Sequence, residues 1–380
     1  MEGNGDKLKT VKERLTNLKI IASTRSVSRA ASNWAVYKTD SDPTTVTDKL
    51  DLLGKMASIT GKGSDVVLSC PGDVKGKEDV ETVLAALEKN KLSATTMVAD
   101  LHIPRKRGVL NHRLMYGTLT SPYPEVRVAS INQVISTLQV MRDVKCRQLG
   151  LWIPDGIDSP GEKNTVDMLD SILKGLRQIG MKVRKSESML LSFRPYGPSY
   201  CGTAVPDWGT AAWMCRETVH SSKLLLDTGS LLPGESLESV AISLLHQKIL
   251  GRLAISDNRL GMGALPAGSL DAGALFRLFL NVLMAEEAGL CSLEDLGIQL
   301  RVESRVGPTL ENLLSAVENT QHALARAALV DLKELRKAQT KPDPIAANQI
   351  LRDAFVTDVR PVVESWRKDN NLPENPFKEL

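Results

Sequence analysis

The sequence predicts a (β/α)8 TIM barrel, in which eight parallel strands alternate with eight helices. Three observations favour this fold. Short apolar runs alternate with longer segments of helical periodicity along most of the chain. The apolar runs are nearly continuous, as in parallel strands that are buried on both faces. No G-x-G-x-x-G motif follows the first runs, which disfavours the dinucleotide-binding form of an open doubly wound sheet.

Each expected strand is an apolar run, and each is followed by a segment of helical spacing. The clearest helix begins at Lys77, because Val80, Val83 and Leu87 recur on one face. Another has Pro124 in its first turn, where proline is tolerated. In chain order the strand and helix pairs are 33–37 with 46–60, 65–70 with 77–90, 93–99 with 124–144, 147–153 with 164–180, 187–193 with 207–220, 223–228 with 235–249, 251–256 with 269–288, and 297–303 with 308–327.

Two segments lie outside this alternation. Residues 1–30 form a basic N-terminal helical segment with its helix over 7–20, and residues 1–29 hold seven Lys and Arg against three Asp and Glu. The barrel is expected over 31–327. Residues 328–380 are predicted to form a C-terminal helical extension, which contains the turn sequence TKPDP.

The composition is that of a globular protein in a reducing compartment. The 380 residues are 42% hydrophobic and 24% charged, and a net charge of +3 does not predict a partner. The five cysteines are scattered with no CxxC pair, so no disulfide framework is expected. No apolar run reaches membrane-spanning length and the N-terminus has no apolar signal region. We therefore expect a cytoplasmic protein without a membrane partner.

A family resemblance rests on several motifs in a fixed order. LGLWIPDGIDSPGE (149–162) follows YGTLTSPYPEVR (116–127), and PDWGTA (206–211), LLLDTG (224–229) and the tail over 328–366 come later. NWAVY (33–37) and VVLSCPGD (66–73) extend the match toward the N-terminus. Over about residues 30–380 the chain resembles the bacterial L-rhamnose isomerases of broad sugar specificity, which are xylose-isomerase-like barrels.

The resemblance implies a metal-dependent aldose–ketose isomerase, commonly a homotetramer that uses manganese. In such enzymes carboxylates and imidazoles at the strand ends hold divalent ions, which polarise the sugar oxygens while hydrogen moves between C1 and C2. Hard divalent ions need several oxygen or nitrogen ligands that converge on one point.

Most positions where the resemblance implies a metal-coordinating residue hold a residue that cannot coordinate a metal well. Asp227 matches an aspartate of the first metal site, and Arg194 stands where the family has a lysine. Glu303 would match a metal-coordinating aspartate of the family if the alignment of the last strand were shifted by one residue. The departures are Ser230 and Ala254 for histidines, Ser192 for a bridging glutamate, Met262, Ala264 and Val302 for aspartates, and Ser69 and Gly72 for an active-site histidine and tryptophan. A single aspartate cannot hold a divalent ion usefully, so we expect no metal cofactor and regard Asp227 as a remnant.

The five histidines do not obviously replace the missing ligands. His220 precedes a strand, at the wrong end of a barrel, and His246 and His322 fall on helical patterns. His102 and His112 flank a loop after the third strand. A displaced site made from these two histidines with Asp227 and Glu303 would bind Mn²⁺ or another divalent cation, and this alternative stays open.

Three residues are candidates for binding a ligand at the barrel mouth. Trp152 could offer a flat apolar face to a sugar ring, and Asp155 could accept a bond from a sugar hydroxyl. The alternative for this segment is a plain strand end and turn. Arg194 could grip a carboxylate or phosphate, because its guanidinium forks around such groups. The alternative for Arg194 is an ion pair with Asp227 or Glu303.

These observations leave three functional hypotheses. The first is a sugar-isomerase-like barrel that has lost metal-dependent catalysis and acts as a binding, regulatory or structural subunit of a homo- or hetero-oligomer or larger assembly. The second is an active L-rhamnose or other sugar isomerase or epimerase with a displaced metal site. The third is a basic adaptor that contacts protein or RNA through IPRKRG (103–108) and the N-terminal helix, although few aromatics accompany these cations, so nucleic acid is the less favoured partner.

Overall fold

A closed barrel of eight parallel strands forms the centre of the computed structural model, which describes residues 2–28, 42–101, 111–197, 202–219, 221–259, 262–303 and 308–380. The barrel closes through β1, which pairs in parallel with both β2 and β12. In order around the barrel the strands are β1 (Ile20–Ser23), β12 (Ile298–Leu300), β9 (Leu250–Ile255), β8 (Ser222–Asp227), β6 (Ser188–Ser192), β4 (Gln148–Trp152), β3 (Ser93–Ala99) and β2 (Asp65–Cys70).

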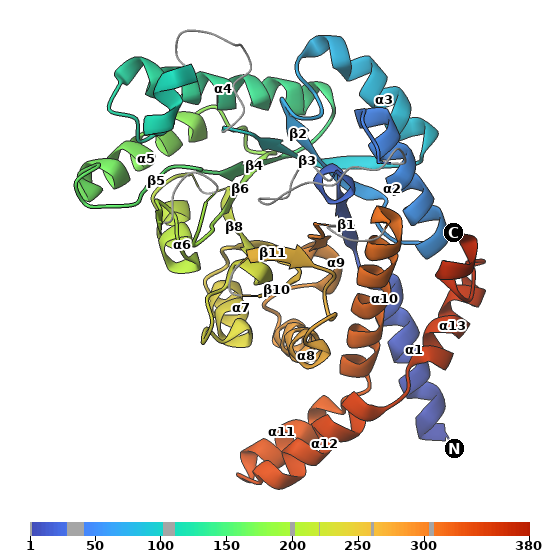
Figure 1. Ribbon diagram of the computed structural model, residues 1–380. Coiled ribbons are helices and arrows are strands. Elements are labelled where there is room, and N and C mark those ends of the chain that lie inside the picture. The colour runs from blue at the N-terminus through green and yellow to red at the C-terminus, as the bar shows by residue number, and fades with distance from the viewer. Residues whose placement is uncertain are drawn as a thin grey trace.

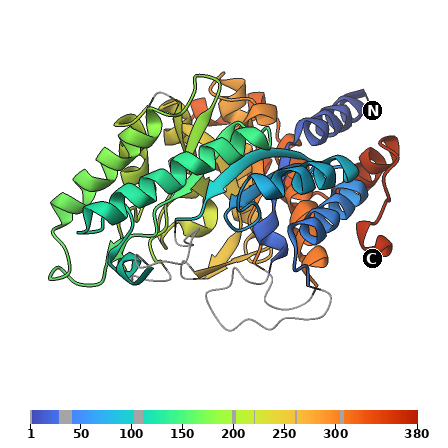
Figure 2. The same cartoon turned by 90° about the horizontal axis from the view of Figure 1, so that it is seen from above.

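The helices surround the barrel, as Figure 1 shows, so the predicted (β/α)8 architecture is confirmed. Figure 2 shows α4 and α5 side by side on one flank of the molecule, where they pack on each other. The surrounding helices are α2 (Val46–Thr60), α3 (Val80–Lys89), α4 (Pro124–Asp143), α5 (Thr165–Gly180), α6 (Trp208–Arg216), α7 (Leu237–His246), α8 (Ala272–Glu287), the short α9 (Leu293–Leu296) and α10 (Thr309–Ala328).

Seven of the predicted strands agree with the structure to within three residues, and the first does not. The predicted strand at 33–37 lies outside the described residues. The strand that fills its place in the barrel is β1, whose four residues are all buried. The barrel therefore starts within residues 1–30, which the sequence analysis assigns to a helical segment. Helix α1 (Glu2–Asn17) ends three residues before β1, because Ile20 and Ile21 bury their side chains as parts of a strand.

Local sequence signals set several of the helix ends. Thr45 caps α2 in a capping box, since its side chain accepts from the Asp48 amide while the Asp48 carboxylate accepts from the Thr45 amide. Gly61 ends the same helix with a φ of 65°, a left-handed conformation that favours glycine. Asp207 caps α6 by accepting from the Thr210 amide at 2.8 Å.

Two short antiparallel sheets of two strands each lie beside the barrel strands. One pairs β5 (Gly156–Ile157) with β7 (Gly202–Thr203), and the other pairs β10 (Asp257–Arg259) with β11 (Met262–Leu265). Each follows the carboxyl end of a barrel strand, where the connecting loops of this fold carry function.

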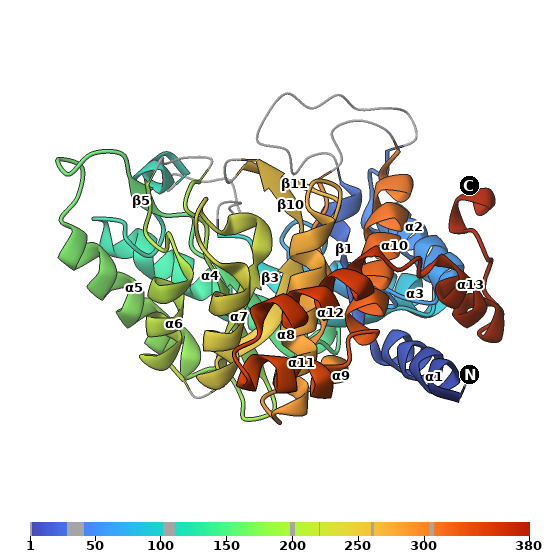
Figure 3. The ribbon, with the colours of Figure 1, turned by 90° about the horizontal axis from the view of Figure 1, so that it is seen from below.

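The C-terminal extension is helical, as predicted. It consists of α11 (Leu332–Thr340), α12 (Pro344–Val356) and α13 (Arg360–Asp369). Figures 1 and 3 both show α13 beside α1. A small apolar cluster joins the two helices, with Val11 and Leu15 from α1 packed against Val362, Val363 and Trp366. Among the described residues, no helix combines the length and apolar character that a membrane-spanning helix needs.

Candidate functional site

A cavity of about 540 Å³ opens at the carboxyl ends of the barrel strands. Every barrel strand, or the residues that follow it, contributes to its wall, so the cavity is the mouth of the barrel. Chemistry in this fold is placed at this end. Small polar side chains from four strands line it, namely Ser69, Thr96, Ser192 and Gln299.

Asp227 lies at the end of β8 with its carboxylate surrounded by hydrogen-bond donors. The residue is 4% exposed. Its Oδ2 accepts from Ser230 Oγ at 2.9 Å, and its Oδ1 accepts from the Gly229 amide at 3.1 Å. Arg301, which follows β12, forms an ion pair with the same Oδ2. Asp227 therefore already has a cation and two neutral donors.

Arg301 connects two of the carboxylates in the mouth. Besides Asp227, its guanidinium lies 3.5 Å from Glu303 Oε1. Burial, and then the positive charge of Arg194, lower the pKa of Arg301 to about 9. The guanidinium is still charged at neutral pH, so Arg301 places a permanent cation beside Asp227.

These residues do not fit a divalent metal centre built on Asp227. In the part of the chain that the structure describes, no group of three or more His, Cys, Asp and Glu is arranged to hold a metal ion. The position where a histidine was expected holds Ser230, whose hydroxyl donates a hydrogen bond to the Asp227 carboxylate. Ser192 and Ala254 line the cavity without ligating capacity comparable to glutamate or histidine. The side chains of His102, His112 and His220 lie outside the described residues.

A second arginine, Arg25, follows β1, the strand that neighbours β12 in the barrel. The Arg25 guanidinium forms an ion pair with Asp100, whose side chain is 2% exposed. Burial, and next the charge of Arg194, lower the pKa of Arg25 to about 10. Nearby, Lys49 Nζ lies 2.8 Å from Asp73 Oδ1. Arg25 was not among the predicted site residues, because the first strand was expected later in the chain, at 33–37.

Arg194 and Trp152 form a stacked pair in the cavity wall. The guanidinium carbon of Arg194 lies 5.0 Å from the centroid of the Trp152 ring, which is within cation–π range. Arg194 makes no ion pair with any described residue. The predicted alternative, an ion pair of Arg194 with Asp227 or Glu303, is therefore wrong, because Arg301 contacts both carboxylates. The predicted positions of Arg194 and Trp152 at the mouth are found.

Asp155 does not line the cavity. It is 1% exposed, and its carboxylate accepts from the Thr118 amide at 2.7 Å, from Thr118 Oγ1 at 2.8 Å and from the Thr120 amide at 2.8 Å. The side chain holds the 118–120 turn against the end of β4. The structure thus favours the strand-end interpretation of this residue over a sugar contact.

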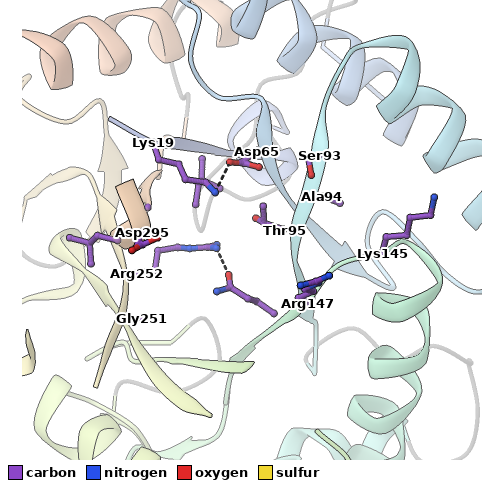
Figure 4. A pocket seen from close by; sticks show the side chains of 14 residues that line it. Lys19, Asp65, Ser93, Ala94, Thr95, Lys145, Arg147, Gly251, Arg252 and Asp295 are labelled. Atoms are coloured by element: carbon purple, nitrogen blue, oxygen red, sulfur yellow. Dashed lines mark hydrogen bonds and ion pairs between the residues drawn. The ribbon is translucent and has the colours of Figure 1, made fainter. Parts of the chain in front are cut away.

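A polar floor separates the mouth from a second cavity at the opposite end of the barrel. Figure 4 shows this second cavity, of about 370 Å³, with Lys19 paired to Asp65 at 3.1 Å. Arg252, which is 3% exposed, lies in the wall of this second cavity. Its guanidinium donates to Gln148 and, at 2.8 Å, to Thr96 Oγ1. Since Thr96 also lines the mouth, Arg252 closes the floor between the two cavities.

Comparison with known proteins agrees with this geometry. The chain matches no family model. It is 23% identical over 367 residues to a protein of Mesorhizobium japonicum named "Probable sugar isomerase", a match that covers 97% of this chain and 84% of that protein. A xylose isomerase domain protein from Alicyclobacillus acidocaldarius superposes with a TM-score of 0.56 at 11% identity, over 82% of this chain and 99% of that one.

The fold is that of the xylose-isomerase-like barrels. A 3-keto-D-glucoside 4-epimerase from E. coli also superposes, with a TM-score of 0.54 at 13% identity, over 82% of this chain and 98% of the other. The predicted resemblance to sugar isomerases is supported at this level. The contact that motif spacing does not predict lies at the end of β8, where Arg301 forms an ion pair with Asp227.

Proposed function

We propose that the protein binds a carbohydrate in its barrel mouth without a divalent ion at Asp227, as a subunit that has lost metal-dependent isomerisation. The observation that carries the proposal is the ion pair of Arg301 with Asp227. The similarity to the Mesorhizobium japonicum protein named "Probable sugar isomerase", which covers 97% of this chain, supports a carbohydrate as the ligand.

The ion pair argues against metal binding at Asp227 on chemical grounds. A divalent ion would have to displace a guanidinium, a hydroxyl and a backbone amide from the Asp227 carboxylate. It would then find only serine and alanine at the neighbouring positions 192, 230 and 254. The positive charge of Arg301 opposes a second cation at the same place.

The cavity retains features that suit a sugar. Its volume of about 540 Å³ lies in the range of small-molecule sites, about 300–1,000 Å³. Trp152 supplies an aromatic wall, and hydroxyl and amide side chains from β2, β3, β6 and β12 supply partners for sugar hydroxyls. Binding through these groups requires no metal ion.

The alternative functions differ from the proposal in measurable ways. A displaced metal site would involve His102 and His112, and an adaptor would use the basic segment 103–108, and both regions lie outside the described side chains. A metal-independent isomerase would use Glu303 as a base beside Arg301. Such an enzyme would turn over sugar in the presence of a chelator.

The test combines metal analysis with sugar titration. After incubation with Mn²⁺ and desalting, elemental mass spectrometry is expected to find no retained ion. A panel of aldoses and ketoses, titrated in chelator, is expected to change the tryptophan fluorescence of the parent protein. Trp152→Phe should lose this change, whereas Trp213→Phe should keep it, because Trp213 lies exposed on α6. About one ion per chain, lost on Asp227→Ala, would contradict the proposal.

A further inference from the structure

Three arginine side chains line the mouth cavity from different strand ends. Arg25 follows β1, Arg194 follows β6 and Arg301 follows β12. Their charges act on one another, since Arg194 lowers the pKa of both Arg25 and Arg301 in addition to the larger effect of burial. A cluster of like charges in a partly buried wall is unfavourable unless anions compensate it.

Carboxylates of the protein compensate two of the three arginines. Arg25 is paired with Asp100, and Arg301 with Asp227 and more distantly with Glu303. Among the lining residues that the structure describes, each acidic residue is thereby in contact with one of these two arginines. Lys49, a fourth basic residue among them, is paired with Asp73.

Of the three arginines, Arg194 is the one that pairs with no described carboxylate. Glu303 acts on it as a nearby charge, without an ion-pair contact. Its guanidinium is held by stacking on Trp152 at 5.0 Å, which leaves its N–H groups available in the cavity. A guanidinium held in one plane is suited to a forked pair of hydrogen bonds with a carboxylate or a phosphate.

We infer that the carbohydrate ligand carries a carboxylate or phosphate group and that Arg194 binds this group. The ligand class is therefore a sugar acid or a sugar phosphate. This inference rests on the proposed carbohydrate-binding function and narrows it to anionic ligands.

The experiment compares ligands that share one ring and differ in charge. Glucose, glucuronate and glucose 6-phosphate are titrated into the full-length protein by calorimetry in chelator, with inorganic phosphate as a fourth ligand. The variants are Arg194→Gln and a matched control, Arg147→Gln, whose side chain is exposed at the opposite end of the barrel. Circular dichroism checks that both variants are folded.

Anionic ligands are expected to bind about tenfold to a hundredfold more tightly than glucose, as for a charge-assisted hydrogen-bonded pair. Arg194→Gln should lower the affinity for the anionic ligands to about that for glucose, and Arg147→Gln should keep the preference. A stronger gain with glucuronate assigns a carboxylate, and a stronger gain with glucose 6-phosphate assigns a phosphate. Binding of inorganic phosphate that Arg194→Gln abolishes supports the anion site on its own.

The failures are distinguishable. If glucose binds as tightly as the anions, or if Arg194→Gln keeps the preference, the inference about charge is overturned while the proposed function stands. If no ligand of the panel binds, both are contradicted. If binding appears only after Mn²⁺ is added, the proposed function fails whatever the charge preference.

Discussion

The ion pair between Arg301 and Asp227 yields a sharp prediction for stability. Arg301→Met removes the guanidinium and keeps an unbranched, uncharged side chain. The Asp227 carboxylate, 4% exposed, then keeps only its bonds from Ser230 and the Gly229 amide. Removing one partner of a fully buried ion pair costs about 3–5 kcal/mol.

Two features reduce that cost here. The cavity admits water to the carboxylate, and removal of Arg301 also relieves its repulsion from Arg194 and Arg25. We therefore expect Arg301→Met to lower the free energy of unfolding by about 2 kcal/mol. Asp227→Asn should cost less, because Arg301 keeps Glu303 at 3.5 Å as a partner.

The assay is a double-mutant cycle read by urea unfolding. The four proteins are the parent, Arg301→Met, Asp227→Asn and the double variant. The double variant should be less destabilised than the sum of the single variants by about 1–2 kcal/mol, since it no longer leaves a charged Asp227 without its cation. Additive costs, or a cost of Arg301→Met below about 0.5 kcal/mol, would refute the assignment of Arg301 as the counter-charge of Asp227.

Three further predictions concern the scaffold. Asp155→Ala should lower the free energy of unfolding by about 2–4 kcal/mol, because it leaves the Thr118 and Thr120 amides without their acceptor. Ligand affinity measured by calorimetry should stay within twofold of the parent, since Asp155 does not line the cavity. Burial, and then neighbouring arginines, lower the pKa of His322 from 6.5 to about 4. As the pH falls, this histidine is therefore protonated in the unfolded chain before it is protonated in the folded protein. The free energy of unfolding should fall by up to about 3 kcal/mol between pH 6.5 and pH 4. In urea unfolding at several pH values His322→Gln should lose this share of the pH dependence, and an unchanged profile would contradict it. Gly61→Ala should cost about 1 kcal/mol by thermal unfolding, because its φ of 65° strains any residue with a Cβ, and a neutral effect would argue against this conformation.

The periodicity of the sequence was sufficient to predict the barrel. Continuous apolar runs such as 65–70 and 93–99 can be buried on both faces only in a parallel sheet with helices on its outside. The first strand was misplaced for a physical reason. Its four residues follow a basic amphipathic helix after only two residues, so Ile20 and Ile21 extend the helical pattern of α1. The run at 33–37 is richer in the aromatic and β-branched residues that favour strands.

The site was predictable in its position and only partly in its chemistry. Asp227, Trp152 and Arg194 lie in the mouth because the ends of parallel strands meet at one edge of the barrel. The roles of Arg301 and Arg25 depend on how the strand ends lie around the closed barrel, because each arginine pairs with a carboxylate two strands away. An arginine within two residues of the end of each of these strands was the available signal. Asp155 was misjudged because a turn that needs an acceptor looks the same in sequence as a ligand contact.

The closure of the barrel is a seam between the two ends of the fold. It joins Ile20 of β1 to Ile298 of β12, two strands of only four and three residues, and the packing of α1 on α13 clasps the same side of the molecule. Arg25 follows β1 on one side of this junction, and Arg301 follows β12 on the other side. A ligand that binds only the closed barrel would stabilise this junction, because binding to the folded form alone adds to its stability. The packing of α13 on α1 lies outside the cavity, so residues that never contact the ligand help to support the part of the barrel that holds it.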